Sequence, residues 1–70
     1  MFSGVELRAL REQRGLTKGV ITERTGLSRS TLVRLEKGLS VPSIETLLKL
    51  ANSMELPLSK LLFRVGILRK

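Results

Sequence analysis

The sequence predicts an all-α fold in a single domain that spans residues 1–70. The first supporting observation is length, because 70 residues suit one small domain. The second is that Ser or Thr repeatedly precedes an apolar stretch and Gly repeatedly follows one, as at the starts and ends of helices. The third is that the apolar residues are mostly Leu, Ile and Val, without Trp or Tyr, as in helical bundles.

The first expected helix spans residues 4–13. Ser3 and Glu6 form a capping box at its start, in which the two side chains accept hydrogen bonds from free backbone N–H groups of the first turn. Leu7 and Leu10 are the inward pair of this helix. A glycine follows its last turn and ends it.

The most informative pattern lies in residues 17–37, which predict two short helices joined by a turn that contains glycine. Thr17 is the N-cap of a helix over about residues 18–24, and Ser28 is the N-cap of a helix over about residues 29–37. Two short helices with a tight turn form a helix-turn-helix, whose second helix can enter the major groove of DNA. The pattern therefore predicts a DNA-binding motif.

Two further helices are expected after a loop at residues 38–42. Ser43 caps the first of them, over about residues 44–54, and Pro57 suits the start of the second, over about residues 58–63. The apolar stripe of the longer helix contains Ile44, Leu47, Leu50, Ala51 and Met54.

The C-terminal residues give a less regular pattern. Phe63, Val65 and Ile67 alternate with other residues as in a strand, and Gly66 argues against a continued helix. The sequence therefore predicts either a short strand or an extended tail for residues 63–68.

The chain is strongly basic, since 13 Lys and Arg residues stand against six acidic residues and give a net charge of +7. Such an excess on a small domain indicates a polyanionic partner or an anionic surface. Not every cation is expected to serve that partner, and the ordinary solvated charges are expected to be Arg24, Lys49 and Lys60.

The composition also excludes several kinds of protein. Without Cys or His there are no disulfides and none of the usual zinc sites, and with no Asp and six scattered Glu there is no paired catalytic arrangement. We therefore expect no enzymatic activity, cofactor or metal site. No apolar run approaches the ~20 residues of a membrane span, and the N-terminus lacks the layout of a signal peptide. We expect a cytoplasmic protein with no membrane partner.

Three segments carry a resemblance to a known family: LRALREQRGLT, GLSRSTLVRLEKG and VPSIETLLKLANSMEL. Their order and spacing make residues 5–62 resemble the lambda-repressor-like, Cro/cI-type helix-turn-helix family, also called the xenobiotic-response-element family. The resemblance implies a compact five-helix domain. It also implies an ion pair between Arg11 and Glu36, which ties the DNA-reading helix to the first helix. At Lys18 the family often has glutamine, and lysine can contact a phosphate through its charge.

The residues expected to contact DNA follow from the direction of the second helix of the motif. Leu32 and Leu35 point inward, so the opposite face is free to read bases. Arginine there suits the two acceptors of guanine. The predicted base contacts are Arg29, Ser30, Val33 and Arg34, and the predicted phosphate contacts are Lys18, Ser28, Thr31, Lys37 and Ser40.

Each of these assignments has an alternative. Ser28 is an N-cap whether or not it contacts DNA. Arg29 and Arg34 would be solvated surface charges on an isolated helix. Lys37 could instead complement the dipole at the C-terminus of its helix.

A homodimer is expected, because one reading helix covers few base pairs and two helices can reach half-sites ~34 Å apart. The candidate dimerisation segment is residues 58–68, either through a strand that pairs with its twofold mate or through helix packing; a disordered tail is the alternative. Its apolar residues are Leu58, Leu62, Phe63, Val65, Ile67 and Leu68.

The predicted function is a sequence-specific regulator of transcription that binds double-stranded DNA, with a repressor on a twofold-symmetric operator as the preferred form. The alternative is an antitoxin or another protein-interaction module that uses the apolar C-terminal surface. Its partner would be a protein such as a toxin or a polymerase.

Overall fold

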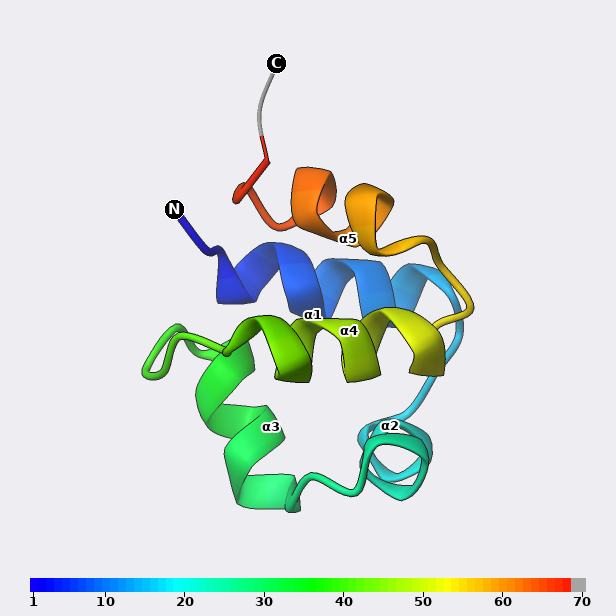
Figure 1. Cartoon of the computed structure of the whole chain (residues 1–70). Helices are drawn as coiled ribbons and strands as arrows, with labels where there is room; N and C mark the ends of the chain where they lie inside the picture. The colour runs from blue at the N-terminus through cyan, green and yellow to red at the C-terminus, as the bar shows by residue number, and fades with distance from the viewer. Residues whose placement is uncertain (69–70) are drawn as a thin grey trace.

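The computed structural model describes residues 1–68, and this part of the chain contains five helices and no strand (Figure 1). The all-α fold class predicted from the sequence is confirmed. The helices are α1 (Gly4–Gln13), α2 (Lys18–Thr25), α3 (Arg29–Glu36), α4 (Ile44–Ser53) and α5 (Leu58–Arg64).

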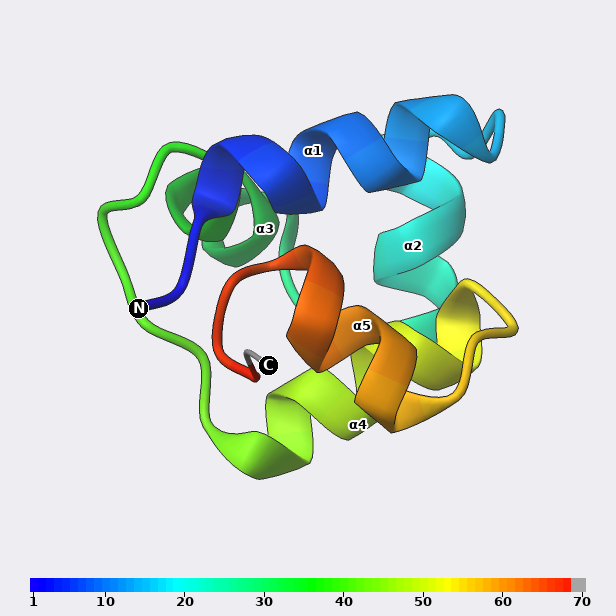
Figure 2. The ribbon, with the colours of Figure 1, turned by 90° about the horizontal axis from the view of Figure 1, so that it is seen from above.

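The helices are arranged with α1 and α4 in the middle, α2 and α3 on one side and α5 on the other (Figure 1). Viewed from above, α5 lies in front and contacts α1 and α4 (Figure 2). The first helix also packs against α3, and α4 packs against α2. The α2–α3 pair is therefore supported by α1 and α4, while α5 contacts neither helix of that pair.

Hydroxyl side chains cap the first four helices. Ser3, Thr17, Ser28 and Ser43 each have an extended backbone and accept a hydrogen bond from the N–H three residues later, at 3.1–3.2 Å. Each bond satisfies one of the free donors of a helix start. Pro57 precedes α5 without a side-chain cap, and its fixed φ favours the start of the helix. The short helices therefore begin where the local sequence predicts.

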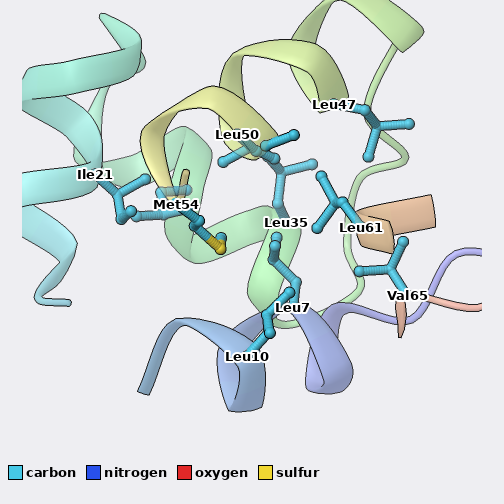
Figure 3. Close-up of a cluster of buried hydrophobic side chains, with 11 residues drawn as sticks. Leu7, Leu10, Ile21, Leu35, Leu47, Leu50, Met54, Leu61 and Val65 are labelled. Carbon is cyan, nitrogen blue, oxygen red and sulfur yellow. The ribbon is translucent and has the colours of Figure 1, made fainter. Parts of the chain in front are cut away.

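The core is formed by apolar side chains from all five helices (Figure 3). Burial of such side chains is the main favourable contribution to folding. In a chain of this length a single core can hold every helix in place. The buried apolar residues are Leu7, Leu10, Ile21, Leu32, Leu35, Leu47, Leu50, Ala51, Met54, Leu61 and Val65.

Close approach between α1 and α3 depends on a glycine. A Cβ atom added to Gly4 would clash with the carbonyl oxygen of Leu35 and come within 2.8 Å of the carbonyl oxygen of Glu36. The start of α1 therefore lies directly against the last turn of α3. This contact fixes the position of α3 relative to the rest of the domain.

The strand considered for residues 63–68 is not present. The last helix continues to Arg64, and Gly66 follows its C-cap with φ 86°. The N–H of Gly66 bonds the Phe63 carbonyl and the N–H of Ile67 bonds the Leu62 carbonyl, which is the hydrogen-bond pattern of a Schellman helix end. The alternation of apolar residues thus comes from a helix that ends in a tight turn.

Two other expectations are corrected. Ile44 was placed in the apolar stripe of α4, yet it is 63% exposed because it lies at the end of the helix, where no other helix covers it. Val65 was placed in a dimer interface, yet it is fully buried in the protomer, and its carbonyl accepts a hydrogen bond from Ser3 N–H at 2.8 Å. Val65 therefore belongs to the core. The predicted bounds of α1 are confirmed, and α2, α3, α4 and α5 begin where predicted but end one residue away from the prediction.

Candidate nucleic-acid interface

The direction of the α3 side chains is set by its inner face. Leu32 and Leu35 are buried in the core. Because they fix the rotation of the helix, the opposite face points to solvent. Arg29, Ser30 and Arg34 are exposed on this face, and Val33 lies beside them and is half-buried. The four predicted base contacts therefore share one outward surface.

A buried ion pair joins α3 to α1. Arg11 Nε donates to Glu36 Oε2 at 2.7 Å, and Arg11 Nη2 donates to Glu36 Oε1 at 3.1 Å. Both residues are only 5% exposed. This two-pronged geometry matches the planar guanidinium to both carboxylate oxygens. The contact holds the last residue of α3 against the middle of the domain.

The same arginine also reaches the start of α2. Arg11 Nη1 donates to the backbone carbonyl of Leu16 at 2.8 Å. One side chain therefore joins α1, the residue before the N-cap of α2, and the end of α3. The family resemblance predicted the pair with Glu36, but no pattern in the sequence indicated the bond to Leu16.

The turn between α2 and α3 is held by a threonine. Thr25 is buried, its hydroxyl donates to the Ile21 carbonyl at 2.8 Å, and the same oxygen accepts from Leu27 N–H at 3.2 Å. Gly26 follows with φ 77°, a conformation that costs glycine little. Thr25 was missed in the sequence analysis, although a hydroxyl residue directly before a helix-ending glycine could have indicated this role.

A second missed contact fixes α2 to α4. Arg24 was expected to be an ordinary solvated charge, but its Nη1 donates to the Ser53 carbonyl at 2.6 Å. Ser53 is the last residue of α4, whose final carbonyls lack partners within the helix. The arginine therefore satisfies an acceptor at a helix end and helps to orient α2. The expectation for Arg24 was wrong because it considered only its own helix.

Two predicted contact residues are brought together after α3. Arg34 Nε donates to Ser40 Oγ at 3.2 Å, and Arg34 Nη2 approaches the Leu39 carbonyl at 3.5 Å. By contrast, the guanidinium of Arg29 makes no hydrogen bond or ion pair within residues 1–68. Arg29 is thus free to contact a ligand, whereas Arg34 already donates to Ser40.

The remaining predicted phosphate contacts surround α3. Lys18 is the first residue of α2, and Lys37 is the C-cap of α3. The Ser28 hydroxyl accepts from Thr31 N–H and lies 2.8 Å from Thr31 Oγ1, so the cap and the neighbouring hydroxyl form one small network. Neither lysine pairs with a carboxylate in the described part of the chain.

The N-termini of the helices differ in charge. The first turns of α1 and α4 each contain an acidic residue, Glu6 and Glu45 respectively, whereas those of α2 and α3 contain none. A helix N-terminus carries a partial positive charge that favours anions. The two helices of the motif therefore leave this charge without an acidic side chain in the first turn.

Some of the exposed apolar side chains lie in α5 and in the residues that follow it. Phe63, Ile67 and Leu68 are exposed, while Leu58 and Leu62 are half-buried. In the view from above, α5 crosses α4 at a steep angle (Figure 2). Two exposed apolar residues of α4 were not part of the predicted dimer interface, Ile44 and Leu48.

Comparison with known proteins identifies the family. Residues 4–60 match the model of the helix-turn-helix domain. The chain belongs to this helix-turn-helix family. The resemblance predicted from the sequence is confirmed.

Curated relatives of this helix-turn-helix chain are named as regulators of transcription. It is 35% identical over 68 residues to the HTH-type transcriptional repressor RghR of Bacillus subtilis, covering 96% of this chain and 50% of that protein. It is 36% identical over 58 residues to the HTH-type transcriptional regulator SutR of Escherichia coli, covering 83% of this chain and 33% of that protein. The chain thus spans half or less of the length of these relatives.

Solved structures show the same arrangement of helices. The restriction-modification controller protein C.AhdI from Aeromonas hydrophila superposes with a TM-score of 0.77 at 33% identity, covering 83% of this chain and 88% of that chain. An HTH_3 family transcriptional regulator from Vibrio cholerae superposes with a TM-score of 0.76 at 36% identity, covering 84% of this chain and 33% of that chain.

No helix within residues 1–68 has the length and apolar character needed to cross a bilayer. The same residues contain no group of three or more acidic, His or Cys side chains that could hold a metal ion.

Proposed function

We propose that this chain is a sequence-specific DNA-binding regulator of transcription that acts as a repressor, and that α3 reads the major groove. The observation that carries the proposal is the two-sided character of α3. Its inner face is fixed by the core and by the ion pair with Arg11, and its outer face presents Arg29 with no partner within residues 1–68. The names of the relatives support the same class of function.

Under this proposal, the outward face of α3 discriminates between bases. Arg29 donates to O6 and N7 of a guanine, which is the commonest specific contact in the major groove. Arg34 does the same. Ser30 bonds a base edge, and Val33 contacts a thymine methyl group.

Phosphate contacts position the helix without reading sequence. Lys18 contributes charge at the start of α2, and Lys37 contributes charge at the end of α3. Ser28, Thr31 and Ser40 contribute hydroxyls, and the uncompensated N-termini of α2 and α3 favour anions. Release of counterions from DNA should make the affinity fall steeply as salt increases.

The proposal also includes a homodimer. The exposed apolar side chains of α5, of the residues after it and of α4 are the candidate interface, because exposed apolar patches on soluble proteins mark contact sites. For such a dimer to read DNA, its twofold axis has to place the two copies of α3 on half-sites ~34 Å apart. The residues of this candidate interface are Ile44, Leu48, Leu58, Leu62, Phe63, Ile67 and Leu68.

The experiment that tests the proposal is the selection of bound duplexes from random DNA. We expect a twofold-symmetric motif with G·C pairs in each half. Arg29→Ala should remove the preference at one position of each half-site, while Lys49→Ala, on the exposed side of α4, should leave the motif unchanged. No enrichment over competitor DNA, or an asymmetric motif, would contradict the dimeric reader.

A second candidate function is supported by the apolar patch itself. A protein-interaction module, such as an antitoxin, would use Phe63 and its neighbours to bind another protein rather than a second copy. Under this candidate, Arg29→Ala with Arg34→Ala would abolish DNA binding and leave protein binding intact, whereas Phe63→Ser would abolish protein binding and leave DNA binding intact. Under the homodimer proposal, Phe63→Ser would instead weaken DNA binding. Neither candidate involves catalysis, a cofactor or a metal ion.

A further inference from the structure

Three cationic side chains from α1, from α2 and from the C-cap of α3 surround one small hollow on the surface. The hollow has a volume of about 100 Å³ and is lined by Arg8 of α1, Lys18 of α2 and the C-cap residue Lys37, together with Val33 and Glu36. Arg8 was not among the residues that the sequence indicated as DNA contacts. It lies outside the helix-turn-helix and reaches this place because α1 packs against α3.

Two of the three cations around the hollow, Lys18 and Lys37, are not paired with an acidic side chain in the described part of the chain. The acidic residue that lines the hollow, Glu36, is already bound on both oxygens by Arg11. Like charges held close together repel one another, so this arrangement favours an external anion.

Arg8 does have an internal partner, but a weak one. Its Nε lies 3.1 Å from Glu12 Oε2, and the two side chains are 59% and 55% exposed. An exposed ion pair of this kind adds little to stability and is screened by salt. The guanidinium can therefore turn from Glu12 to a phosphate at little cost.

The hollow is continuous with the surface proposed to read DNA. Val33, which lines it, is a predicted base contact on the outward face of α3. Lys18 also lines a second hollow, which contains Arg29 and the start of α2. Cations therefore follow one flank of the reading helix from Arg29 past Lys18 to Arg8 and Lys37.

We infer that Arg8 binds a backbone phosphate of DNA, together with Lys18 and Lys37, and that the DNA-binding surface therefore extends onto α1. The inference rests on the proposed function, because the ligand is the DNA duplex that α3 reads. A duplex carries one charge per ~1.7 Å of its axis. A phosphate beside the major groove lies where a cation on the flank of the reading helix can meet it.

The test is a salt titration of DNA binding with Arg8→Gln in the full chain, on the duplex selected with the unaltered protein. Because each protomer of the proposed dimer loses one phosphate contact, Arg8→Gln should lower the slope of log affinity against log salt by about 1.8. The affinity defect of the variant should therefore shrink about 12-fold between ~50 and ~200 mM salt. The selected base motif should not change, since a phosphate contact carries no sequence information.

Two further variants make the result specific. Lys60→Gln removes the same charge from α5, which lies on the far side of the molecule from α2 and α3 (Figure 1), and should keep the original slope. Arg8→Lys keeps the charge and should restore most of the slope. Circular dichroism and thermal melting should show that all three variants fold, because both sites are exposed.

Two outcomes overturn the inference while the proposed function stands: an unchanged slope in Arg8→Gln, or an equal loss of slope in Lys60→Gln. The second outcome would mean that net charge, rather than a local contact, determines the affinity. If the unaltered chain binds no duplex in preference to competitor DNA, the proposed function fails first and the inference fails with it.

Discussion

The inner and outer faces of α3 differ in the burial and in the contacts of their side chains. On the inner face, Leu32 and Leu35 are buried and Glu36 is held by Arg11. On the outer face, Arg29 and Ser30 are exposed. The inner face therefore determines where the helix lies, and the outer face is free to determine what it contacts. Substitutions on the two faces should accordingly affect different measurements.

The largest effect is expected when the buried ion pair is broken. Glu36→Ala leaves the buried Arg11 guanidinium with only the exposed Glu12 carboxylate, 3.9 Å away, as a counter-charge. Removal of one partner of a buried pair costs about 3–5 kcal/mol of unfolding free energy. A domain of this size has a total of only roughly 3.5–10 kcal/mol. Urea denaturation followed by circular dichroism measures the loss.

The control for this prediction replaces both partners. Arg11→Met with Glu36→Leu removes the charge and its partner together, and should recover much of the lost stability. If Glu36→Ala alone lost less than about 1 kcal/mol, the pair would behave as an exposed one and its proposed role in holding α3 would be wrong.

A slightly smaller loss is expected from the apolar part of the same face. Leu32→Ala removes a fully buried side chain and leaves a cavity, which costs about 2–5 kcal/mol. DNA binding should fall only in proportion to the unfolded fraction. Affinity measured well below the melting temperature checks this, and a loss of affinity in the fully folded variant would contradict the separation of the two faces.

The sequence predicted the features of this fold that depend on neighbouring residues. The N-caps Ser3, Thr17, Ser28 and Ser43 were all identified correctly, because an N-cap and its partner are three residues apart. The other half of the capping box predicted with Glu6 was wrong, because the Ser3 N–H donates to the Val65 carbonyl instead. The class of fold followed from these starts and from the apolar spacing. Local rules were sufficient here because the helices are short and begin with side-chain caps.

Features that depend on the crossing of distant helices were not predictable in the same way. The bond from Arg24 to Ser53 joins residues 29 apart, and the approach of Arg8 to Lys37 depends on how α1 packs on α3. The Arg11–Glu36 pair was expected only from the family resemblance. The base and phosphate contacts stay predictions.

The strand considered for residues 63–68, which the structure does not contain, has a related explanation. Alternating apolar residues fit a strand, but they also fit the end of a helix followed by a glycine turn. Burial distinguishes the strand from the helix end, because Val65 is buried in the core four residues after the buried Leu61. The i, i+4 spacing of these two residues was the signal in the sequence that favoured a longer helix.

The outer face should show the opposite behaviour to Leu32. Arg29→Ala removes the proposed guanine contact and should weaken binding to the selected duplex roughly 10- to 100-fold, mainly by loss of sequence preference. Stability should change by less than about 0.5 kcal/mol, as for other surface substitutions. Fluorescence anisotropy with specific and mismatched duplexes measures the difference. An equal loss of affinity for the specific and the mismatched duplex would indicate that Arg29 contacts a phosphate and not a base.

The smallest effect should come from the boundary between the two faces, at the N-cap of α3. Ser28→Ala removes the hydroxyl that accepts from Thr31 N–H and should cost about 1 kcal/mol of unfolding free energy. Ser28→Asp should keep that stability, because aspartate caps as well as serine and its charge favours a helix N-terminus. The same carboxylate should repel a phosphate at this end of α3, so DNA affinity should fall although the fold does not weaken. If Ser28→Asp bound DNA as well as the unaltered chain, a negative charge at the N-terminus of α3 would not affect DNA binding. The lack of an acidic residue in the first turn of α3, in contrast to α1 and α4, would then be unrelated to DNA.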